Sequence, residues 1–252
     1  MKPFEAFGTI IQPGKALGKA HKWEPSHTAS VSSSESPTTI DVASELRNLN
    51  ESLLKLDSQL ADVEAKTKEK VGTNEAEIFG AHRLMLQDPE LLDGIKNKIT
   101  ASKISAAAAT LQVTEDYARQ LEQLNNQYLQ QRAHDVRDVG QQLIDILEGH
   151  DSKIQWPSED FVLVAEDIPP SVMAQLENTK VKGFILSKGG ITSHSAILAR
   201  SLGLPALFNI GSSIHEIQSG DWLALDANVG QFVVRPTEDS RETLYQEMQI
   251  EI

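Results

Sequence analysis

A single histidine stands at a glycine-rich junction in the stretch GGITSHSAILARSLGLPAL, residues 189–207. The two glycines let the backbone approach an anion closely, and either Thr192 or Ser193 can cap the helix whose apolar pattern begins directly afterwards. The free N–H groups and the dipole of a helix N-terminus favour negative charge at this place. The spacing therefore places His194 where a phosphate group would bind.

The imidazole of His194 has the chemistry for phosphoryl transfer. Near neutral pH it offers an unprotonated nitrogen that can attack phosphorus. Catalysis of phosphoryl transfer consists mostly of positioning and of stabilising charge on the equatorial oxygens. The stretch thus predicts that His194 itself carries a phosphoryl group; the alternative is the packing role that a lone histidine has by default.

The segments around this loop predict an α/β domain. Five short β-type runs, with helical stretches between some of them, occupy residues 161–167, 181–187, 205–211, 221–227 and 231–236, and the helical stretches are 171–178 and 194–203. The opening segment 7–23 is also β-like, with a turn at Pro13–Gly14. We expect it to pair with the C-terminal half, which makes the α/β domain discontinuous.

Residues 41–148 predict helices and carry no strand signal. Asp41 is a good N-cap, and apolar residues then follow at alternating steps of four and three, a seam that needs a partner helix. These residues are Val42, Leu46, Leu49, Leu53, Leu56, Leu60 and Val63. Residues 74–99 predict one helix and a shorter one broken near Asp88–Pro89, and residues 104–148 hold two more.

The predicted organisation is therefore two domains and a connector. The α/β domain comprises residues 1–23 and 149–252, and the helical subdomain of antiparallel hairpins comprises residues 41–148. Residues 24–40 form a polar linker rich in serine and proline. The helical subdomain is an insertion near the start of the α/β domain.

The composition excludes several classes of protein. The chain has 252 residues, 36 acidic against 23 basic, and a formal charge of -13, which disfavours nucleic acid and anionic membranes and suits a basic protein partner. It has no cysteine, which excludes disulfides and zinc-thiolate sites. No apolar run approaches the length of a membrane span, and we expect a cytoplasmic protein.

The stretch 189–207 resembles the phosphohistidine signature of the PEP-utilising enzymes: a glycine pair, one or two hydroxyl residues, histidine, and then ARSLGLPA. Upstream, GTIIQPGKALGKA, EIFGAHRLMLQDPEL (77–91) and YLQQRAHDVRDVGQQL (128–143) resemble the N-terminal half of enzyme I of the bacterial PEP-dependent sugar phosphotransferase system. The resemblance extends from about residue 7 to about residue 247. It implies an α/β phosphohistidine (swivelling) domain with an inserted all-α helical-hairpin subdomain.

The resemblance also implies an activity and a partner. His194 takes a phosphoryl group at Nε2 and passes it to a histidine of the carrier protein HPr, or of an HPr-like domain, docked on the helical subdomain. In the family, PEP binds in a separate C-terminal barrel domain, and this chain ends at Ile252. We therefore expect exchange with the carrier but no self-phosphorylation from PEP, no cofactor or metal within this chain, and PEP and Mg²⁺ only with that further domain.

Site residues are carried over from the resemblance one at a time. His194 matches the phosphorylated histidine, and the phosphate loop is matched by Gly189, Gly190, Thr192, Ser193 and Arg200. The residues implied for carrier binding are Ile78, His82, Met85, Leu91, Leu129, Arg132 and Arg137. For Ile78, Met85 and Leu91 the alternative is core packing.

The chain departs from the family pattern near the loop. Pro169, in DIPPS, replaces a threonine whose hydroxyl orients the resting histidine, so another group must set the tautomer of His194 or its orientation. Ile191 replaces a frequent arginine, and Lys188 either compensates as a charge near the phosphate or is a solvated loop lysine. These departures keep open the alternative of a catalytically silent, carrier-binding regulatory module with the same fold.

The sequence gives weaker support to other kinds of chemistry than to phosphoryl transfer. The seven histidines lack metal-ligand spacing, so we expect no metal site. The adjacent Ser193, His194 and Ser195 do not form a hydrolase triad, and no G-x-S-x-G elbow is present. The DVRD sequence at 135–138 predicts ion pairs on a helix surface, and Asp226 suits either a functional or a turn role.

Overall fold

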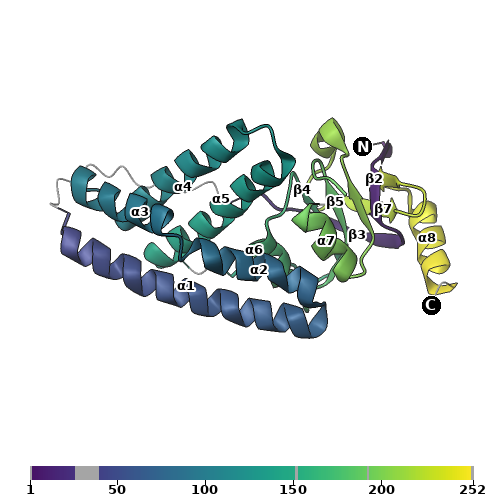
Figure 1. The fold of residues 1–252 in the computed structure, drawn as a ribbon. Helices are drawn as coiled ribbons and strands as arrows, with labels where there is room; N and C mark the ends of the chain where they lie inside the picture. The colour runs from purple at the N-terminus through teal and green to yellow at the C-terminus, as the bar shows by residue number, and fades with distance from the viewer. Residues whose placement is uncertain (1, 26–39, 151–152, 192, 251–252) are drawn as a thin grey trace. The chain divides into compact units, whose positions relative to one another are not determined.

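The computed structural model describes residues 2–25, 40–150, 153–191 and 193–250 (Figure 1). The chain divides into two compact units, one formed by Met1–Pro25 and Ile154–Ile252 and the other by Ser26–Lys153. The predicted linker at 24–40 falls almost entirely on residues 26–39, which lie outside the described part of the chain. The predicted fold class, an α/β unit with an inserted helical unit, is confirmed.

The described part of the helical unit is all α. Its elements are α1 (Val42–Lys70), α2 (Thr73–Met85), α3 (Pro89–Ser102), α4 (Ala106–Gln123) and α5 (Gln127–Leu147). The break predicted at Asp88–Pro89 separates α2 from α3, and these two helices are nearly equal in length. Helix α1 packs on α2, and α4 packs on α5, as antiparallel neighbours joined by short turns.

Side-chain caps define where most of these helices begin. The capping side chains that accept a backbone N–H bond in the first turn are Asp41, Asp88, Ser105 and Asn126. Each such cap satisfies a helix N–H group that has no intrahelical partner and stabilises the helix by about 1 kcal/mol. The prediction that Asp41 caps the first helix is confirmed, since its side chain accepts from the N–H of Ala43 at 3.1 Å.

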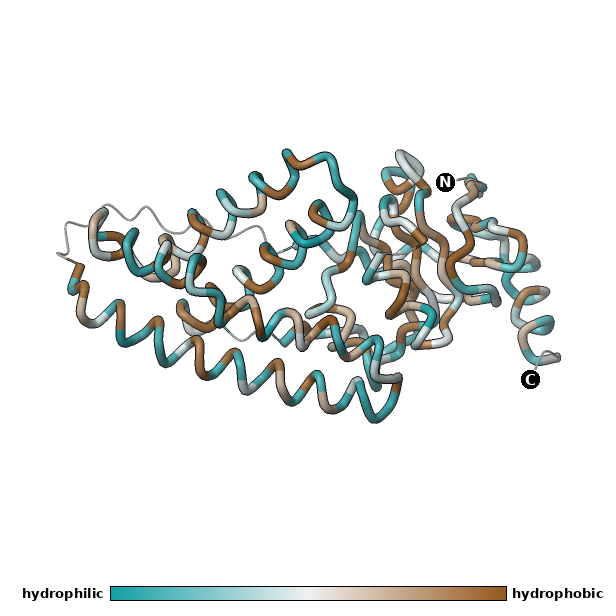
Figure 2. Tube along the Cα trace, in the orientation of Figure 1, coloured by the Kyte–Doolittle hydropathy of each residue, from teal (hydrophilic) through white to brown (hydrophobic). Residues whose placement is uncertain are grey.

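The predicted seam of α1 faces the core of the helical unit. Leu49, Leu56 and Leu60 are buried, whereas Leu54, one position off the seam, is exposed. Figure 2 shows the resulting alternation of hydrophobic and hydrophilic turns along α1. The spacing of four and three thus correctly predicted which face of the helix packs inward.

The α/β unit is built on an eight-stranded sheet of described residues, in the order β1-β8-β7-β3-β4-β5-β6-β2. The strands are β1 (Phe4–Phe7), β2 (Thr9–Gln12), β3 (Lys15–Lys22), β4 (Phe161–Ala165), β5 (Val181–Leu186), β6 (Ala206–Phe208), β7 (Trp222–Asp226) and β8 (Gln231–Val234). The helices are α6 (Pro170–Met173), α7 (His194–Ser201) and α8 (Glu238–Ile250), with short 3₁₀ helices at Ala174–Leu176 and Gly211–Glu216. Strands β3, β4, β5 and β6 are parallel neighbours.

The opening segment pairs with the C-terminal half, as predicted. Strand β1 pairs with β8, β2 with β6, and β3 lies between β4 and β7. Strand β4 is buried on both faces, which explains its continuous apolar sequence, and in β5 all residues but Lys182 are buried. These central strands end next to the histidine loop and therefore position it.

Gly8 joins the two edges of the sheet. Strands β1 and β2 are the opposite edge strands, and Gly8 alone separates them along the chain, so the sheet must curl until its edges meet. The N–H of Gly8 donates to the carbonyl of Gly230 at 3.0 Å. A Cβ at this position would lie 2.8 Å from the carbonyl oxygen of Phe208 and 2.9 Å from Ile210. Only glycine fits this closure without movement of the backbone.

Helix α8 is absent from the sequence-based prediction. It lies across the strands from α7 in Figure 1 and is held by an ion pair between Lys15 and Glu247 at 2.9 Å. The guanidinium of Arg241 also lies 4.8 Å from the ring centroid of Trp222. Because the sequence of α8 is mostly polar, it lacks the strong apolar period that would predict a packed helix.

His21 makes the stability of the α/β unit depend on pH. Its imidazole packs edge-on against the rings of Trp156 and Phe161, and burial lowers its pKa from the ordinary value of 6.5. As the pH falls, the unfolded chain therefore binds this proton first. The contribution of neutral His21 to the free energy of unfolding is complete above about pH 6.5 and is lost as the pH falls below that value.

We predict that urea unfolding between pH 7.5 and 5 shows a smaller loss of stability for His21→Leu than for the parent. The exposed His215→Gln serves as the control, and equal slopes for His21→Leu and the parent would refute the assignment.

Candidate active site

The histidine loop leaves the end of β5 and enters α7. Gly189 has a φ of +106°, a conformation that glycine adopts without strain, and a Cβ there would lie 3.0 Å from the ring of Phe208. A Cβ on Gly190 would meet no atom within 4 Å, so space is open beside this residue. Gly189 thus adopts a backbone conformation that other residues rarely adopt, and the space beside Gly190 leaves the backbone there accessible.

Ser193 and Arg200 fasten the loop to α7. The hydroxyl of Ser193 donates to the carbonyl of Gly190 at 2.8 Å and accepts from the N–H of Ala196 at 3.2 Å, so Ser193 is the N-cap of the helix. The guanidinium of Arg200 donates to the carbonyl of Ile191 at 2.8 Å. These contacts fix the course of the backbone around the loop. Thr192, the other predicted cap and loop residue, lies outside the described residues.

His194 is the first residue of α7 and is half-buried. The first N–H groups of an α-helix have no intrahelical partner, and the helix dipole adds positive potential at the same end. An anion beside His194 would therefore meet backbone donors as well as the imidazole. This arrangement can hold a phosphoryl group while a ring nitrogen reacts with it.

Ser195, the residue after His194, contacts Asp167, although the sequence does not predict either of them as a site residue. The buried hydroxyl of Ser195 donates to Oδ1 of Asp167 at 2.8 Å and lies 3.1 Å from the carbonyl oxygen of Ile168. The same Oδ1 accepts from the N–H of Ile168 at 2.8 Å. The signal in the sequence is positional: Asp167 follows β4 and the histidine loop follows β5, and the carboxyl ends of parallel strands meet at one edge.

The structure shows the contacts of Pro169, which departs from the family pattern, and of Lys188, the lysine just before the glycine pair. Lys188 forms an exposed ion pair with Glu166, and its N–H donates to the carbonyl of Glu166 at 2.9 Å. Pro169 caps α6 through its carbonyl, which accepts from the N–H groups of Val172 and Met173, both at 3.1 Å. Proline has no side-chain donor, so Pro169 offers no hydroxyl to His194.

Four of the residues predicted to bind the carrier are buried in the helical unit. They are Ile78, His82, Met85 and Leu91, each less than a tenth exposed. For Ile78, Met85 and Leu91, the structure therefore favours the alternative of core packing. His82 is wholly buried, so its side chain has no exposed surface for a partner.

His82 belongs to a buried polar cluster that corrects the prediction for DVRD. Its Nε2 lies 3.4 Å from Oδ1 of Asp135, its Nδ1 lies 4.0 Å from Oδ2 of Asp138, and its ring packs edge-on against Phe79. Both carboxylates are nearly fully buried. The prediction of surface ion pairs is therefore wrong for these two aspartates, because the face of α5 that carries them packs against α2.

Arg137 forms ion pairs within the helical unit. Its guanidinium donates to Glu115 at 2.9 Å and to Glu122 at 3.1 Å, both on α4. Hydrogen bonding to Arg137 lowers the pKa of both carboxyl groups, and the two carboxylates raise the pKa of Arg137. Arg137 therefore joins α5 to α4, and its side chain remains 32% exposed.

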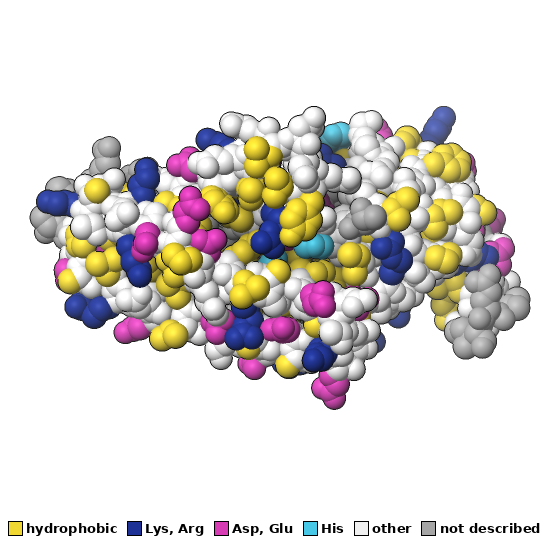
Figure 3. All heavy atoms as spheres, viewed as in Figure 1, with side chains coloured by type: hydrophobic (Ala, Val, Ile, Leu, Met, Phe, Trp, Pro, Cys, Tyr) yellow, Lys and Arg dark blue, Asp and Glu magenta, His cyan; other side chains and the backbone are white. Residues whose placement is uncertain are grey.

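Leu129, Arg132 and Arg137 are the predicted carrier-binding residues that are partly exposed. The guanidinium of Arg132 lies 5.8 Å from the ring centroid of Tyr128, which is itself 64% exposed. Leu84 of α2 and Leu124, which follows α4, are also exposed. Figure 3 shows hydrophobic side chains gathered over the start of α5. Leu84, Leu124 and Tyr128 are thus accessible apolar residues that the sequence analysis did not name as carrier-binding residues.

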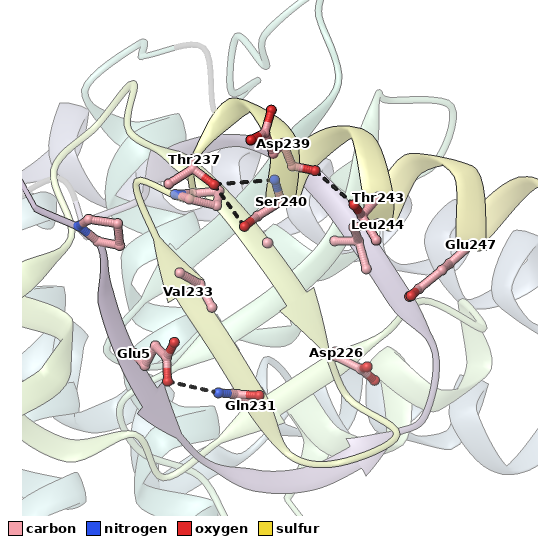
Figure 4. A pocket seen from close by; sticks show the side chains of 13 residues that line it. Glu5, Asp226, Gln231, Val233, Thr237, Asp239, Ser240, Thr243, Leu244 and Glu247 are labelled. Atoms are coloured by element: carbon pink, nitrogen blue, oxygen red, sulfur yellow. Dashed lines mark hydrogen bonds between the residues drawn. The ribbon is translucent and has the colours of Figure 1, made fainter.

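One pocket of the α/β unit lies away from the histidine loop. It is an open groove of about 550 Å³ between α8 and the outer face of β1, β7 and β8 (Figure 4). Its walls include Glu5, Asp226 and Val233 from the strands and Leu244 and Glu247 from α8. Asp226 also accepts from the N–H of Asn228 in the turn after β7, which supports its turn role. No residue of the loop 189–194 lines this groove.

Two further searches concern the described residues alone. Among them, no group of three or more His, Cys, Asp or Glu side chains could hold a metal ion. None of their helices combines the length and apolar character needed to span a bilayer.

Comparison with known families agrees with the fold and the loop, which together define an α/β phosphohistidine-type domain with a helical insertion. A model of the N-terminal domain of PEP-utilising enzymes matches residues 7–132, and a model of the mobile domain of PEP-utilising enzymes matches residues 157–230. The chain therefore belongs to the family of PEP-utilising enzymes.

Within this family the chain is similar to the N-terminal part of enzyme I. It is 36% identical to the phosphoenolpyruvate-protein phosphotransferases of Geobacillus stearothermophilus and Priestia megaterium, over 91% and 94% of its length respectively. It covers 39% and 41% of those relatives, so it spans about two fifths of their length.

Solved structures show the same correspondence. The solution structure of enzyme I (nEIt) shares 30% identity and a TM-score of 0.69, with 98% of this chain and 99% of that chain covered. The N-terminal domain of the nitrogen enzyme 1 has a TM-score of 0.62 over 96% and 98% of the two chains. At 24% identity, the second likeness concerns the fold alone.

Proposed function

We propose that this chain carries a phosphoryl group on Nε2 of His194 and exchanges it reversibly with a histidine of HPr or of an HPr-like domain. The observation that carries the proposal is the position of His194 at the N-terminus of α7, directly after an accessible glycine loop. The similarity to phosphoenolpyruvate-protein phosphotransferases supports the same reaction.

The chemistry is a transfer between two imidazoles. The lone pair of Nε2 attacks phosphorus as the N–P bond of the carrier breaks, and the carrier imidazole leaves with the electron pair of that bond. His194 keeps its proton on Nδ1 throughout, so no other acid or base is needed. The N–H groups at the start of α7 stabilise the charge on the phosphoryl oxygens.

The carrier is proposed to bind the helical unit at the accessible residues Leu84, Leu124, Tyr128, Leu129 and Arg132. A surface that is apolar at its centre suits a protein partner, and exposed Tyr and Arg side chains are common anchors in interfaces. The net charge of -13 favours a basic carrier.

The proposal assigns to this chain the phosphoryl acceptor and the exchange with the carrier. Phosphorylation from PEP with Mg²⁺ is assigned to the C-terminal domain that the resemblance implies. We expect this chain to gain phosphate from PEP once enzyme I and the carrier of a phosphotransferase system are added.

The experiment that tests the proposal is incubation with radiolabelled phospho-HPr. We expect label on the protein that survives alkali and is lost in acid, as for a phosphohistidine, and that returns to unlabelled HPr. Absence of label, while HPr binding is still seen by titration, would contradict phosphotransfer. It would support the alternative of a regulatory module, which the proline at position 169 in place of the family's threonine keeps open. Absence of both would exclude HPr as the carrier.

A further inference from the structure

We propose that Asp167 and Ser195 are positioning residues, which hold the first turn of α7 so that the imidazole of His194 points toward its reaction partner. This inference rests on the proposed function of His194. Neither residue needs to touch the phosphoryl group, since both act through the backbone that carries the histidine.

The contact between the two side chains is short and shielded from water. The hydroxyl of Ser195 is 2.8 Å from Oδ1 of Asp167, and Ser195 is 4% exposed. Oδ1 also accepts the N–H of Ile168 at 2.8 Å, which fixes the carboxylate relative to its own backbone. Hydrogen bonds to a charged acceptor are about twice as strong as neutral ones, and more so where water is excluded.

The same segment holds the histidine loop from its other end. The N–H of Lys188 donates to the carbonyl of Glu166 at 2.9 Å, directly before the glycine pair. Residues 189–194 therefore span the distance between two anchors on the adjacent residues 166 and 167. A flexible glycine loop held at both ends has few backbone conformations left.

The direction of the His194 side chain depends on this anchoring. Ser195 follows His194 directly in the first turn of α7, so a rotation of that turn rotates the imidazole with it. Pro169 offers no side-chain hydrogen bond to the ring. The cap made by Ser193 satisfies the N–H of Ala196 but does not tie the helix to another element, whereas Asp167 does so from the end of β4.

The test compares Ser195→Ala and Asp167→Ala with the conservative Ser195→Thr. A misplacement of a reacting group by about 1 Å can cost about 100-fold in rate, and a smaller displacement costs less. We expect Ser195→Ala and Asp167→Ala each to slow phosphoryl exchange by up to about this factor without changing the Kd for HPr, because the docking surface is untouched. Ser195→Thr keeps the hydroxyl and should restore most of the rate. The double variant should be little slower than either single variant, since each single variant already removes the hydrogen bond between Ser195 and Asp167.

A second measurement follows the state of the His194 ring in the unphosphorylated protein. The ¹⁵N chemical shifts of the His194 ring reveal its tautomer, and we expect Ser195→Ala to change them while Ser195→Thr does not. Ser201→Ala is the matched control, because the hydroxyl of Ser201 also lies in α7 but donates to the carbonyl of Leu198 within the helix. It should leave the rate and the shifts unchanged.

The outcomes separate this inference from the proposed function. If the parent chain takes up label and Ser195→Ala does so equally fast with unchanged ring shifts, the positioning role is wrong and the phosphotransfer function stands. If the parent chain takes up no label, the proposed function fails, and the ring shifts alone decide whether the contact orients His194.

Discussion

Replacement of His194 by glutamine is expected to abolish phosphoryl uptake from phospho-HPr, with a residual rate at least about 1,000-fold below the parent. The amide of glutamine has no nitrogen lone pair that can attack phosphorus, so the covalent intermediate cannot form. Glutamine is polar and of similar length, and His194 is half-buried at a helix start, so the folded structure should tolerate the change.

The control for this prediction is His215→Gln. His215 lies in the 3₁₀ helix Gly211–Glu216 of the same unit and is exposed, so the change is chemically identical but outside the loop. Its uptake of label should equal that of the parent, and both variants should show the parent's circular dichroism and Kd for HPr. Label retained by His194→Gln would place the phosphoryl group on another residue.

Replacement of His82 by alanine is expected to lower the free energy of unfolding of the helical unit by about 3–5 kcal/mol. The change removes a wholly buried ring from α2 and leaves a cavity beside Phe79. It also takes the imidazole away from two buried carboxylates, those of Asp135 and Asp138, that approach it from α5. Both effects weaken the packing of α2 against α5.

Urea unfolding followed by circular dichroism measures this loss, and Leu84→Ala is the matched control. Leu84 lies in the same helix and is 69% exposed, so its truncation should cost less than about 0.5 kcal/mol. The two variants also separate docking from folding. At temperatures where both remain folded, Leu84→Ala should weaken HPr binding and His82→Ala should not. The reverse pattern would restore the docking role that the sequence predicted for His82.

The helices and most strands could be predicted because their signals are local. Capping residues such as Asp41 and Asp88, the break at Pro89 and the seam of α1 depend on a few neighbouring residues. Helix α8 could not be predicted in this way, because its position is held by contacts of Lys15 and Trp222 with residues far along the chain. The closure at Gly8 likewise depends on Phe208 and Ile210, which are distant in sequence.

The candidate site shows the same division. The glycine pair, the cap at Ser193 and the position of His194 follow from adjacent residues. The contact between Asp167 and Ser195 joins residues 28 positions apart and needs the order of the parallel strands to be known. The burial of His82 could not be read from the sequence, because the same spacing suits an exposed face or a core face until the packing partner is known.

The closure of the sheet at Gly8 has a kinetic consequence. Strand β1 pairs with β8, and Phe4 lies opposite Val234. The hydrogen bonds between these two strands can therefore form only after Val234 has left the ribosome. The helical unit is continuous in sequence and can fold as soon as its own residues have emerged. Contacts this far apart in sequence are slow to form because the intervening chain must first be closed into a loop. The histidine loop would thus acquire its final geometry only after Val234 has been synthesised, when the surface proposed to bind the carrier can already be folded.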